Sequence, residues 1–142
     1  MAQTPDAGPA AGSAGAATVA SIMQRAPVTT TPVELLSAAQ EVMAQRGLHQ
    51  LPVIEGGHLV GILAERDLHE HTGYLQRTKV DAAMTSNPIT VAPDTSAQQA
   101  AQLLIEKSIN ALPVVDGGQL VGIVSRTDLL RLLVGLLDDR RA

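Results

Sequence analysis

Two short segments of the sequence combine side chains that could recognise a ligand. Residues 125–128 are Ser-Arg-Thr-Asp, and residues 64–67 are Ala-Glu-Arg-Asp. A carboxylate offers several acceptor positions and can take hydrogen bonds from both hydroxyls of a vicinal diol such as ribose. If a helix begins at Arg126, its first N–H groups and its dipole favour an anion such as phosphate. The Ser125 hydroxyl could add one more donor.

The same residues also suit a purely structural role. Ser125 at a helix N-cap, with Asp128 three residues later, supplies both halves of a capping box. Ala64 has no hydroxyl, so the reciprocal box is not available beside Asp67, although a carboxylate near a helix start still gains from the dipole. The residues alone leave ligand binding and capping both open, and the two roles are compatible.

These two segments belong to a repeat that covers most of the chain. An offset of 61 residues aligns Val19–Leu68 with Val80–Leu129 without a gap, and 17 of the 50 positions are identical. The repeat predicts two equivalent units related by a pseudo-two-fold axis. We expect a first unit over residues 18–76 and a second over 77–142. Residues 1–17 have almost no bulky side chain, which predicts a disordered tail.

The second copy shows the elements that would hold the Ser-Arg-Thr-Asp segment. The β-branched stretch PITVAP, residues 88–93, predicts a strand. Thr95 and Gln98 predict the cap and box partner of a following helix. LPVV and LVGIV predict two strands joined by a tight turn at residues 116–119, and a closing helix follows. The buried face of the first helix is predicted to carry Ala97, Ala100, Ala101 and Leu104.

The first copy follows the same order of elements. Its helix start is predicted from Thr31, Pro32 and Glu34, and its buried stripe from Leu36, Ala39 and Met43. Each unit is therefore predicted as β-α-β-β-α, and the fold class as mixed α/β, or α+β.

The two tandem units resemble a pair of cystathionine-β-synthase (CBS) domains, often called a Bateman module. The resemblance covers about residues 18–137. It rests on the combination of Met84 and Pro88, the alanine-rich helix, Leu-Pro-Val, the Gly-Gly turn and the ending Gly-Ile-Val-Ser-x-x-Asp. It implies a regulatory module, not an enzyme, with no enzyme cofactor. Such modules bind AMP, ADP, ATP or S-adenosylmethionine in clefts between the repeats and signal to a partner protein.

The resemblance also implies which residues form the clefts. In the family, the Asp-bearing turn of one repeat faces the opening segment of the other repeat and the residues before that repeat's Leu-Pro-Val. The first implied site comprises Thr18, Ser21, Met23, Leu48, His49, Gln50, Ser125, Arg126, Thr127 and Asp128. The second and weaker implied site comprises Asp67, Arg66, Lys79, Ala82, Met84, Ile109, Asn110 and Ala111.

The two implied sites differ in their chemistry. The second departs from the family pattern at Ala64 and Lys79, while Arg66 and Lys79 could supply charge for a phosphate. Only the first has a hydroxyl at the helix cap, so we expect the site with Asp128 to be the principal adenosine site.

Composition narrows the classes of partner. The chain of 142 residues has a net charge of −4, no cysteine and a single aromatic residue, Tyr74. An acidic chain without stacking rings is a poor candidate for nucleic-acid binding, and no apolar run reaches the length of a membrane span. Missing cysteines exclude disulfides and thiolate metal sites. Since the first residues do not resemble a signal peptide, we expect a cytoplasmic location.

Three further features favour ordinary structural roles. Gly117 and Gly118 lie between two strands, so they indicate a hairpin turn and not a phosphate loop. His69 and His71 lie two positions apart on a helix and do not face each other, so we expect no metal site. No nucleophile motif is present, so we expect no catalytic residue.

The end of the chain predicts an assembly. Residues 129–137, LLRLLVGLL, place leucines on nearly every side of a helix. A helix that is apolar all round favours burial all round, which indicates contact with a second subunit and a homodimer of four repeats. The alternative to nucleotide sensing is a docking or assembly module whose nucleotide sites are vestigial.

Overall fold

The computed structural model describes residues 17–141, with side chains as far as Asp139. Apart from Ala17, the predicted disordered tail of residues 1–17 lies outside the described residues. The chain forms two compact units. The unit that we call the Asp128 unit comprises the described residues up to Arg25, together with Ile89–Gly117 and the described residues from Val121 onward. The Asp67 unit comprises Ala26–Pro88 and Gly118–Leu120.

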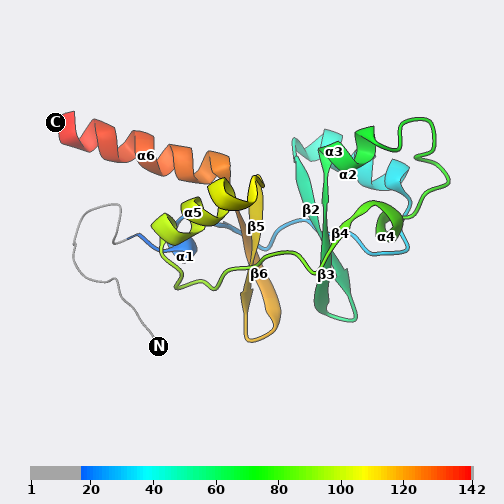
Figure 1. Cartoon of the computed structure of the whole chain (residues 1–142), viewed down its shortest axis with the longest axis horizontal. Coiled ribbons are helices and arrows are strands. Elements are labelled where there is room, and N and C mark those ends of the chain that lie inside the picture. Colours follow the sequence, from blue (N-terminus) through cyan, green and yellow to red (C-terminus); the bar gives the residue numbers. More distant parts are fainter. Residues whose placement is uncertain (1–16, 142) are drawn as a thin grey trace. The chain divides into compact units, whose positions relative to one another are not determined.

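The Asp67 unit is built on a small antiparallel sheet with helices beside it (Figure 1). The strands β2, β3 and β4 follow one another in the sheet, and the register of β2 against β3 shifts at Val53. The elements in chain order are α2 (Leu36–Arg46), β2 (Gln50–Glu55), β3 (His58–Ala64), α3 (Glu65–His69), α4 (Val80–Ala83) and β4 (Thr85–Ser86).

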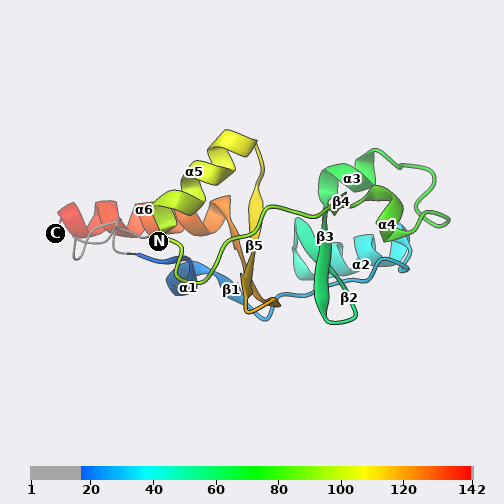
Figure 2. The same ribbon diagram turned by 60° about the horizontal axis from the view of Figure 1, so that its bottom comes forward.

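The Asp128 unit repeats this arrangement, with strand order β1-β6-β5 (Figures 1 and 2). Its last helix is longer than its counterpart α3, and the helix extends past α5 in both views. The elements are α1 (Val19–Ile22), β1 (Gln24–Arg25), α5 (Ala97–Lys107), β5 (Ala111–Asp116), β6 (Gln119–Ser125) and α6 (Arg126–Arg141).

The two repeats exchange their opening segments. The opening segment of the first repeat packs in the Asp128 unit, and that of the second repeat packs in the Asp67 unit. In the Asp128 unit, the Val19 N–H donates to the carbonyl of Thr95 at 2.8 Å, and β1 forms the edge of the sheet beside β6. At the equivalent place in the Asp67 unit, the Val80 N–H donates to the carbonyl of Glu34 at 2.8 Å, and β4 pairs with β3. Each sheet therefore has one edge strand that comes from the other repeat.

Each unit has its own apolar core, and the two cores use equivalent positions. The predicted stripe of Leu36, Ala39 and Met43 is buried, which confirms it. In the second copy Ala97, Ala100 and Leu104 are buried, while Ala101 is half-buried. The cores are Leu36, Ala39, Met43, Leu51, Val53, Leu63, Leu68 and Val80 in one unit, and Val19, Val91, Ala100, Leu104, Leu112, Val114 and Val124 in the other.

The strand predicted over residues 88–93 is wrong. Only Val91 makes a bridge there, parallel to Val114, with its N–H bonded to the carbonyl of Pro113 at 3.1 Å. Pro88 and Pro93 have no N–H to donate, so the segment cannot continue as a ladder.

The predicted start of the helix in the second copy is displaced by one residue. Ser96, not Thr95, is the N-cap of α5, and its hydroxyl accepts a hydrogen bond from the Gln99 N–H at 3.0 Å. The Thr95 hydroxyl accepts from the Ala92 N–H at 3.0 Å and closes the preceding turn instead. Since both hydroxyls can make such local bonds, sequence does not decide between them.

The predicted helix start at Thr31, Pro32 and Glu34 is also wrong. Helix α2 begins at Leu36 and has no side-chain cap. The Leu36 N–H instead donates to the carbonyl of Thr78 at 2.8 Å. A backbone carbonyl from the other repeat thus takes the place of a capping side chain at this end of the helix.

The hairpin and the closing helix of the second copy are confirmed. Gly117 and Gly118 have φ angles of +58° and +84°, as a two-residue hairpin turn requires. Helix α6 begins at Arg126, directly after β6.

Replacing Gly122 with alanine is expected to lower the free energy of unfolding by about 1–3 kcal/mol, measured by urea denaturation. A Cβ at this position would lie 2.6 Å from Met23 Sδ and 2.9 Å from the carbonyl oxygen of Gln24. The second atom belongs to the backbone of β1 and cannot move without disturbing its pairing with β6.

Gly135 in α6 provides the matched control. A Cβ there meets nothing within 4 Å. Replacing Gly135 with alanine is therefore expected to raise stability by roughly 0.5–1 kcal/mol through helix propensity. Equal effects of the two substitutions would contradict the close approach of β1 to Gly122.

Candidate functional site

The Asp128 side chain lies where β6 ends and α6 begins. It is 5% exposed, which is unusual for a carboxylate. One of its oxygens, Oδ2, accepts from the Ser125 N–H at 2.8 Å and from the Ser125 hydroxyl at 3.0 Å. The same hydroxyl accepts from the Asp128 N–H at 3.3 Å. The capping box that the sequence allows is therefore formed.

The other oxygen of Asp128 has a partner that sequence reasoning missed. Gln24 Nε2 in β1 donates to Asp128 Oδ1 at 3.0 Å, across 104 residues of sequence. The pairing of Gln24 with Ile123 of β6 brings the amide to the end of that strand. The one available signal was the comparison of copies, since Gln24 aligns with the shorter Thr85.

The equivalent carboxylate, Asp67, has a simpler environment. It is 9% exposed, and its Oδ2 accepts from the Ala64 N–H at 2.8 Å. This is the half of the capping box that needs no hydroxyl. Among the described residues, no amide from β4 reaches Asp67 as Gln24 reaches Asp128.

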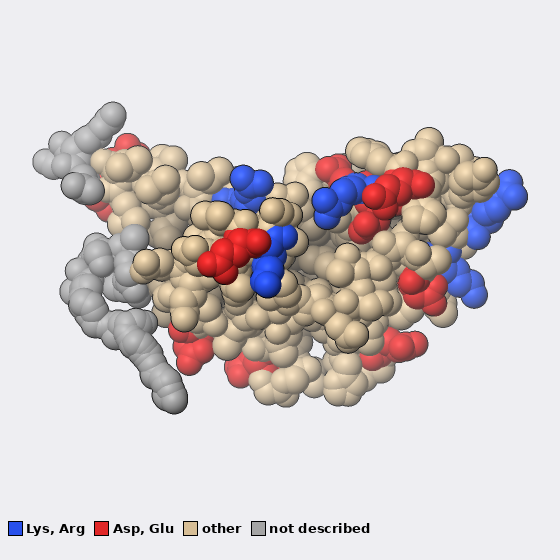
Figure 3. Space-filling model, in the orientation of Figure 1, with Lys and Arg blue, Asp and Glu red and all other residues tan. Residues whose placement is uncertain are grey.

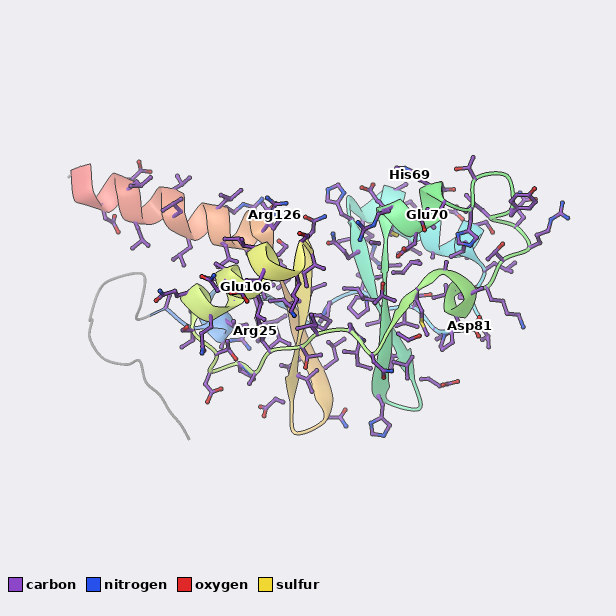
Figure 4. The ribbon with its side chains drawn as sticks, viewed as in Figure 1. Arg25, His69, Glu70, Asp81, Glu106 and Arg126 are labelled. Carbon is purple, nitrogen blue, oxygen red and sulfur yellow. The ribbon has the colours of Figure 1, made fainter. Side chains whose placement is uncertain are left out.

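A polar pair stands beside each turn, with opposite charge in the two units. Arg126, labelled at the start of α6 in Figure 4, donates to Asn110 Oδ1 at 3.1 Å. At the equivalent place in the Asp67 unit, His49 Nδ1 lies 2.9 Å from Glu65 Oε1. The Asp128 turn thus carries a cation at the first helical position, where the Asp67 turn carries an anion.

The backbone donors at the start of α6 are partly used. The Arg126 N–H donates to the carbonyl of Asn110 at 3.0 Å, and the Asp128 N–H is bonded to the Ser125 hydroxyl. A phosphate at this turn would rely on the Arg126 guanidinium and on Thr127 more than on a row of free N–H groups.

The structure brings part of each predicted site together within one unit. The Asp128 unit holds Thr18, Ser21 and Met23 of the opening segment along with residues 125–128, and also residues 109–111, which were predicted for the second site. The Asp67 unit holds Arg66, Asp67, Lys79, Ala82 and Met84, and also residues 48–50, which were predicted for the first site. The Ser21 hydroxyl is bonded to the carbonyl of Thr18 at 2.6 Å.

A separate apolar groove lies between α5 and α6 in the Asp128 unit. It has a volume of about 710 Å³ and is lined by Leu104, Ile105, Leu129, Leu133 and Leu136, among others. Along α6 the large apolar residues Leu130, Leu133, Val134 and Leu137 fall at helical spacing and are 49–59% exposed. We call these four residues the α6 stripe.

Other kinds of site find little support within residues 17–141. This range holds no group of three histidine, aspartate or glutamate residues placed to share a metal ion. Nor does it hold a helix both long and apolar enough to cross a membrane. On the face drawn in Figure 3, acidic and basic side chains are interspersed and do not form a basic patch. His69 and Glu70 lie at the end of α3 (Figure 4).

Comparison with known families decides the class of protein. The family model for the CBS domain matches the sequence twice, over residues 19–72 and 80–135. The chain belongs to the CBS-domain family. The two matches, a mixed helix-and-strand fold and the neighbouring structures confirm the predicted pair of CBS repeats.

Solved CBS pairs resemble the chain along most of its length. CBSX2 of Arabidopsis thaliana in complex with AMP is 30% identical, with a TM-score of 0.77 over 84% of this chain and 98% of that one. The CBS pair of protein MJ0100, in complex with 5′-methylthioadenosine and S-adenosylmethionine, is 28% identical, with a TM-score of 0.78 over 83% and 96%.

A CBS pair also occurs inside a larger enzyme. The chain is 36% identical over 104 residues to inosine-5′-monophosphate dehydrogenase of Korarchaeum cryptofilum. This match covers 72% of the chain but spans 21% of that enzyme.

Proposed function

We propose that this CBS pair is a regulatory sensor that binds an adenosine-containing ligand, AMP, ADP, ATP or S-adenosylmethionine, and signals to a partner protein. The observation that carries the proposal is the buried Asp128 at the start of α6, an acceptor for ribose hydroxyls. Arg126 beside it is bonded to the neutral Asn110 side chain, so the positive charge of its guanidinium is not neutralised by that partner and can bind a phosphate.

The neighbouring structures support this class of ligand. CBSX2 was solved with AMP and the MJ0100 pair with S-adenosylmethionine, and both chains are almost fully covered by this one. Asp128 serves the principal site and Asp67 a weaker second site, each completed by the remaining residues predicted for it. We place the sensor in the cytoplasm, where adenosine nucleotides are plentiful, and assign it no catalytic role.

The proposed module is a homodimer that joins four repeats. The α5–α6 groove and the α6 stripe form an apolar surface on a helix that extends past α5. Large exposed apolar patches on a soluble domain mark interaction sites. A second copy of the chain would cover this surface with an equally apolar helix.

A ligand screen by thermal shift tests the sensing function. A ligand present at a hundred times its dissociation constant adds about 2.7 kcal/mol of stability. For a chain of this size the melting temperature should rise by roughly 5–10 °C. AMP, ADP, ATP and S-adenosylmethionine are the test ligands, and GMP, which shares the ribose and phosphate of AMP, is the control for recognition of the adenine base.

The same screen separates the alternative function. A docking or assembly module with vestigial nucleotide sites would show no shift with any adenosine ligand. If the adenosine ligands raise the melting temperature no more than GMP does, that result would also contradict an adenosine-selective sensor.

A further inference from the structure

We propose that Gln24 is a displaceable lock on Asp128, and that a ribonucleotide must break the Gln24–Asp128 bond to bind. This inference rests on the proposed nucleotide function and adds a residue that sets the affinity and the ribose selectivity of one site. It starts from the 3.0 Å bond between Gln24 Nε2 and Asp128 Oδ1.

The acceptor capacity of the Asp128 carboxylate limits how many partners it can bond at one time. An ionised carboxylate has about four lone-pair positions. At Asp128 three of them are taken, two by the N–H and hydroxyl of Ser125 and one by Gln24. The two hydroxyls of a ribose need two positions, and one remains. Either the Ser125 hydroxyl or the Gln24 amide must give way.

The Gln24 amide is the partner that can leave more easily. The Ser125 hydroxyl is held on both sides, because it donates to Asp128 Oδ2 and accepts from the Asp128 N–H. The Gln24 residue is exposed at the sheet edge, so its amide can turn to water. The strand itself stays in place, since β1 pairs with β6 through the backbone.

The Asp67 unit shows the same site without a lock. Thr85 stands at the position equivalent to Gln24, and within residues 17–141 the Asp67 carboxylate accepts one bond, from the Ala64 N–H. About three acceptor positions therefore remain there. A ribose can bind Asp67 without displacing any group, whereas binding to Asp128 is coupled to release of the Gln24 side chain.

Titration calorimetry with AMP tests the lock. The measurements use full-length protein carrying Asp67→Ala, which leaves one carboxylate site, and compare it with the same protein carrying Gln24→Ala. Removing one competing hydrogen bond to a charged carboxylate should tighten AMP binding by about 10- to 150-fold. Thr85→Ala in the same background is the matched control and should leave the affinity for AMP unchanged.

The nucleotide 2′-deoxy-AMP makes the test specific. It has one ribose-type hydroxyl at this edge and can use the acceptor position that is already free. Gln24→Ala should therefore improve binding of AMP more than binding of 2′-deoxy-AMP. A purely structural effect of the substitution would change both affinities by the same factor.

The NMR signals of the Gln24 side-chain amide report on the Gln24–Asp128 bond directly, independently of any change in the affinity for AMP. These signals should move on Asp128→Asn substitution, and AMP should move them away from their bonded position in the unsubstituted protein.

Each outcome counts for or against the lock. If the Asp67→Ala protein binds AMP and Gln24→Ala leaves that affinity equal or weaker, the lock is wrong and the sensing function stands. If AMP binds but leaves the Gln24 amide signals unmoved, the lock is again wrong. If none of the proteins binds any adenosine ligand, the proposed function fails, and the lock fails with it.

Discussion

Replacing Asp128 with alanine is expected to weaken AMP binding at least tenfold. The carboxylate is buried and lies at the start of α6, where two ribose hydroxyls would bond to it. A hydrogen bond to a charged group contributes roughly 1.5–3 kcal/mol, and tenfold in affinity corresponds to about 1.4 kcal/mol. Titration calorimetry of the variant and the unsubstituted protein measures the change directly.

Two controls separate lost binding from lost folding. Asp128→Ala removes the acceptor of the Ser125 N–H and hydroxyl, so α6 keeps its Ser125 cap but loses the reciprocal half of its capping box, and the melting temperature must be measured alongside. Asp67→Ala removes the equivalent carboxylate and should weaken AMP binding less. If Asp67→Ala abolishes AMP binding while Asp128→Ala leaves it intact, the assignment of the principal site is reversed.

The double substitution Leu133→Glu and Leu137→Glu is expected to convert the proposed homodimer into monomers at micromolar concentration. A homodimer would carry four new carboxylates in place of exposed leucines of the α6 stripe. Each leucine is 49% exposed, so covering it contributes about half of the roughly 1.5–3 kcal/mol of full burial, and the dissociation constant should rise by about 10²- to 10⁴-fold. Light scattering during size-exclusion chromatography gives the mass.

Arg131 supplies the control for charge on the same helix. Arg131→Glu changes an exposed residue of α6 outside the stripe and should leave the mass of the dimer unchanged. A monomeric mass for the unsubstituted protein would contradict the dimer outright. Monomers formed by Arg131→Glu would show that charge, and not the leucine surface, holds the subunits together.

Much of the local structure could be predicted, because its causes lie within a few residues. The buried stripe of Leu36, Ala39 and Met43 follows from helical spacing, and the hairpin at Gly117 and Gly118 follows from turn chemistry. The capping relation of Ser125 and Asp128 has the same short range. Local pattern is sufficient in all three cases.

The sequence-based predictions were wrong where a segment far away in the sequence determines the local structure. The start of α2 depends on the carbonyl of Thr78, which no local signal near Leu36 reveals. The strand expected over residues 88–93 reduces to one bridge, because Val91 meets Val114 from a different strand. Gln24 meets Asp128 across 104 residues. Hydrophobic periodicity carries no information about contacts between residues so far apart in the sequence, so it does not predict the Gln24–Asp128 bond.

Because the repeats exchange their opening segments, neither repeat alone contains all the strands of its own sheet. A chain cut after residue 76 would keep β2 and β3 but lose the edge strand β4 and the buried Val80, while α1 and β1 would have no sheet to join. A protein with one such repeat could complete its sheet by trading these segments with a second molecule. The tandem chain is in this sense a domain-swapped dimer whose partners have become covalently joined, so the swap takes place at fixed local concentration and cannot be lost by dilution.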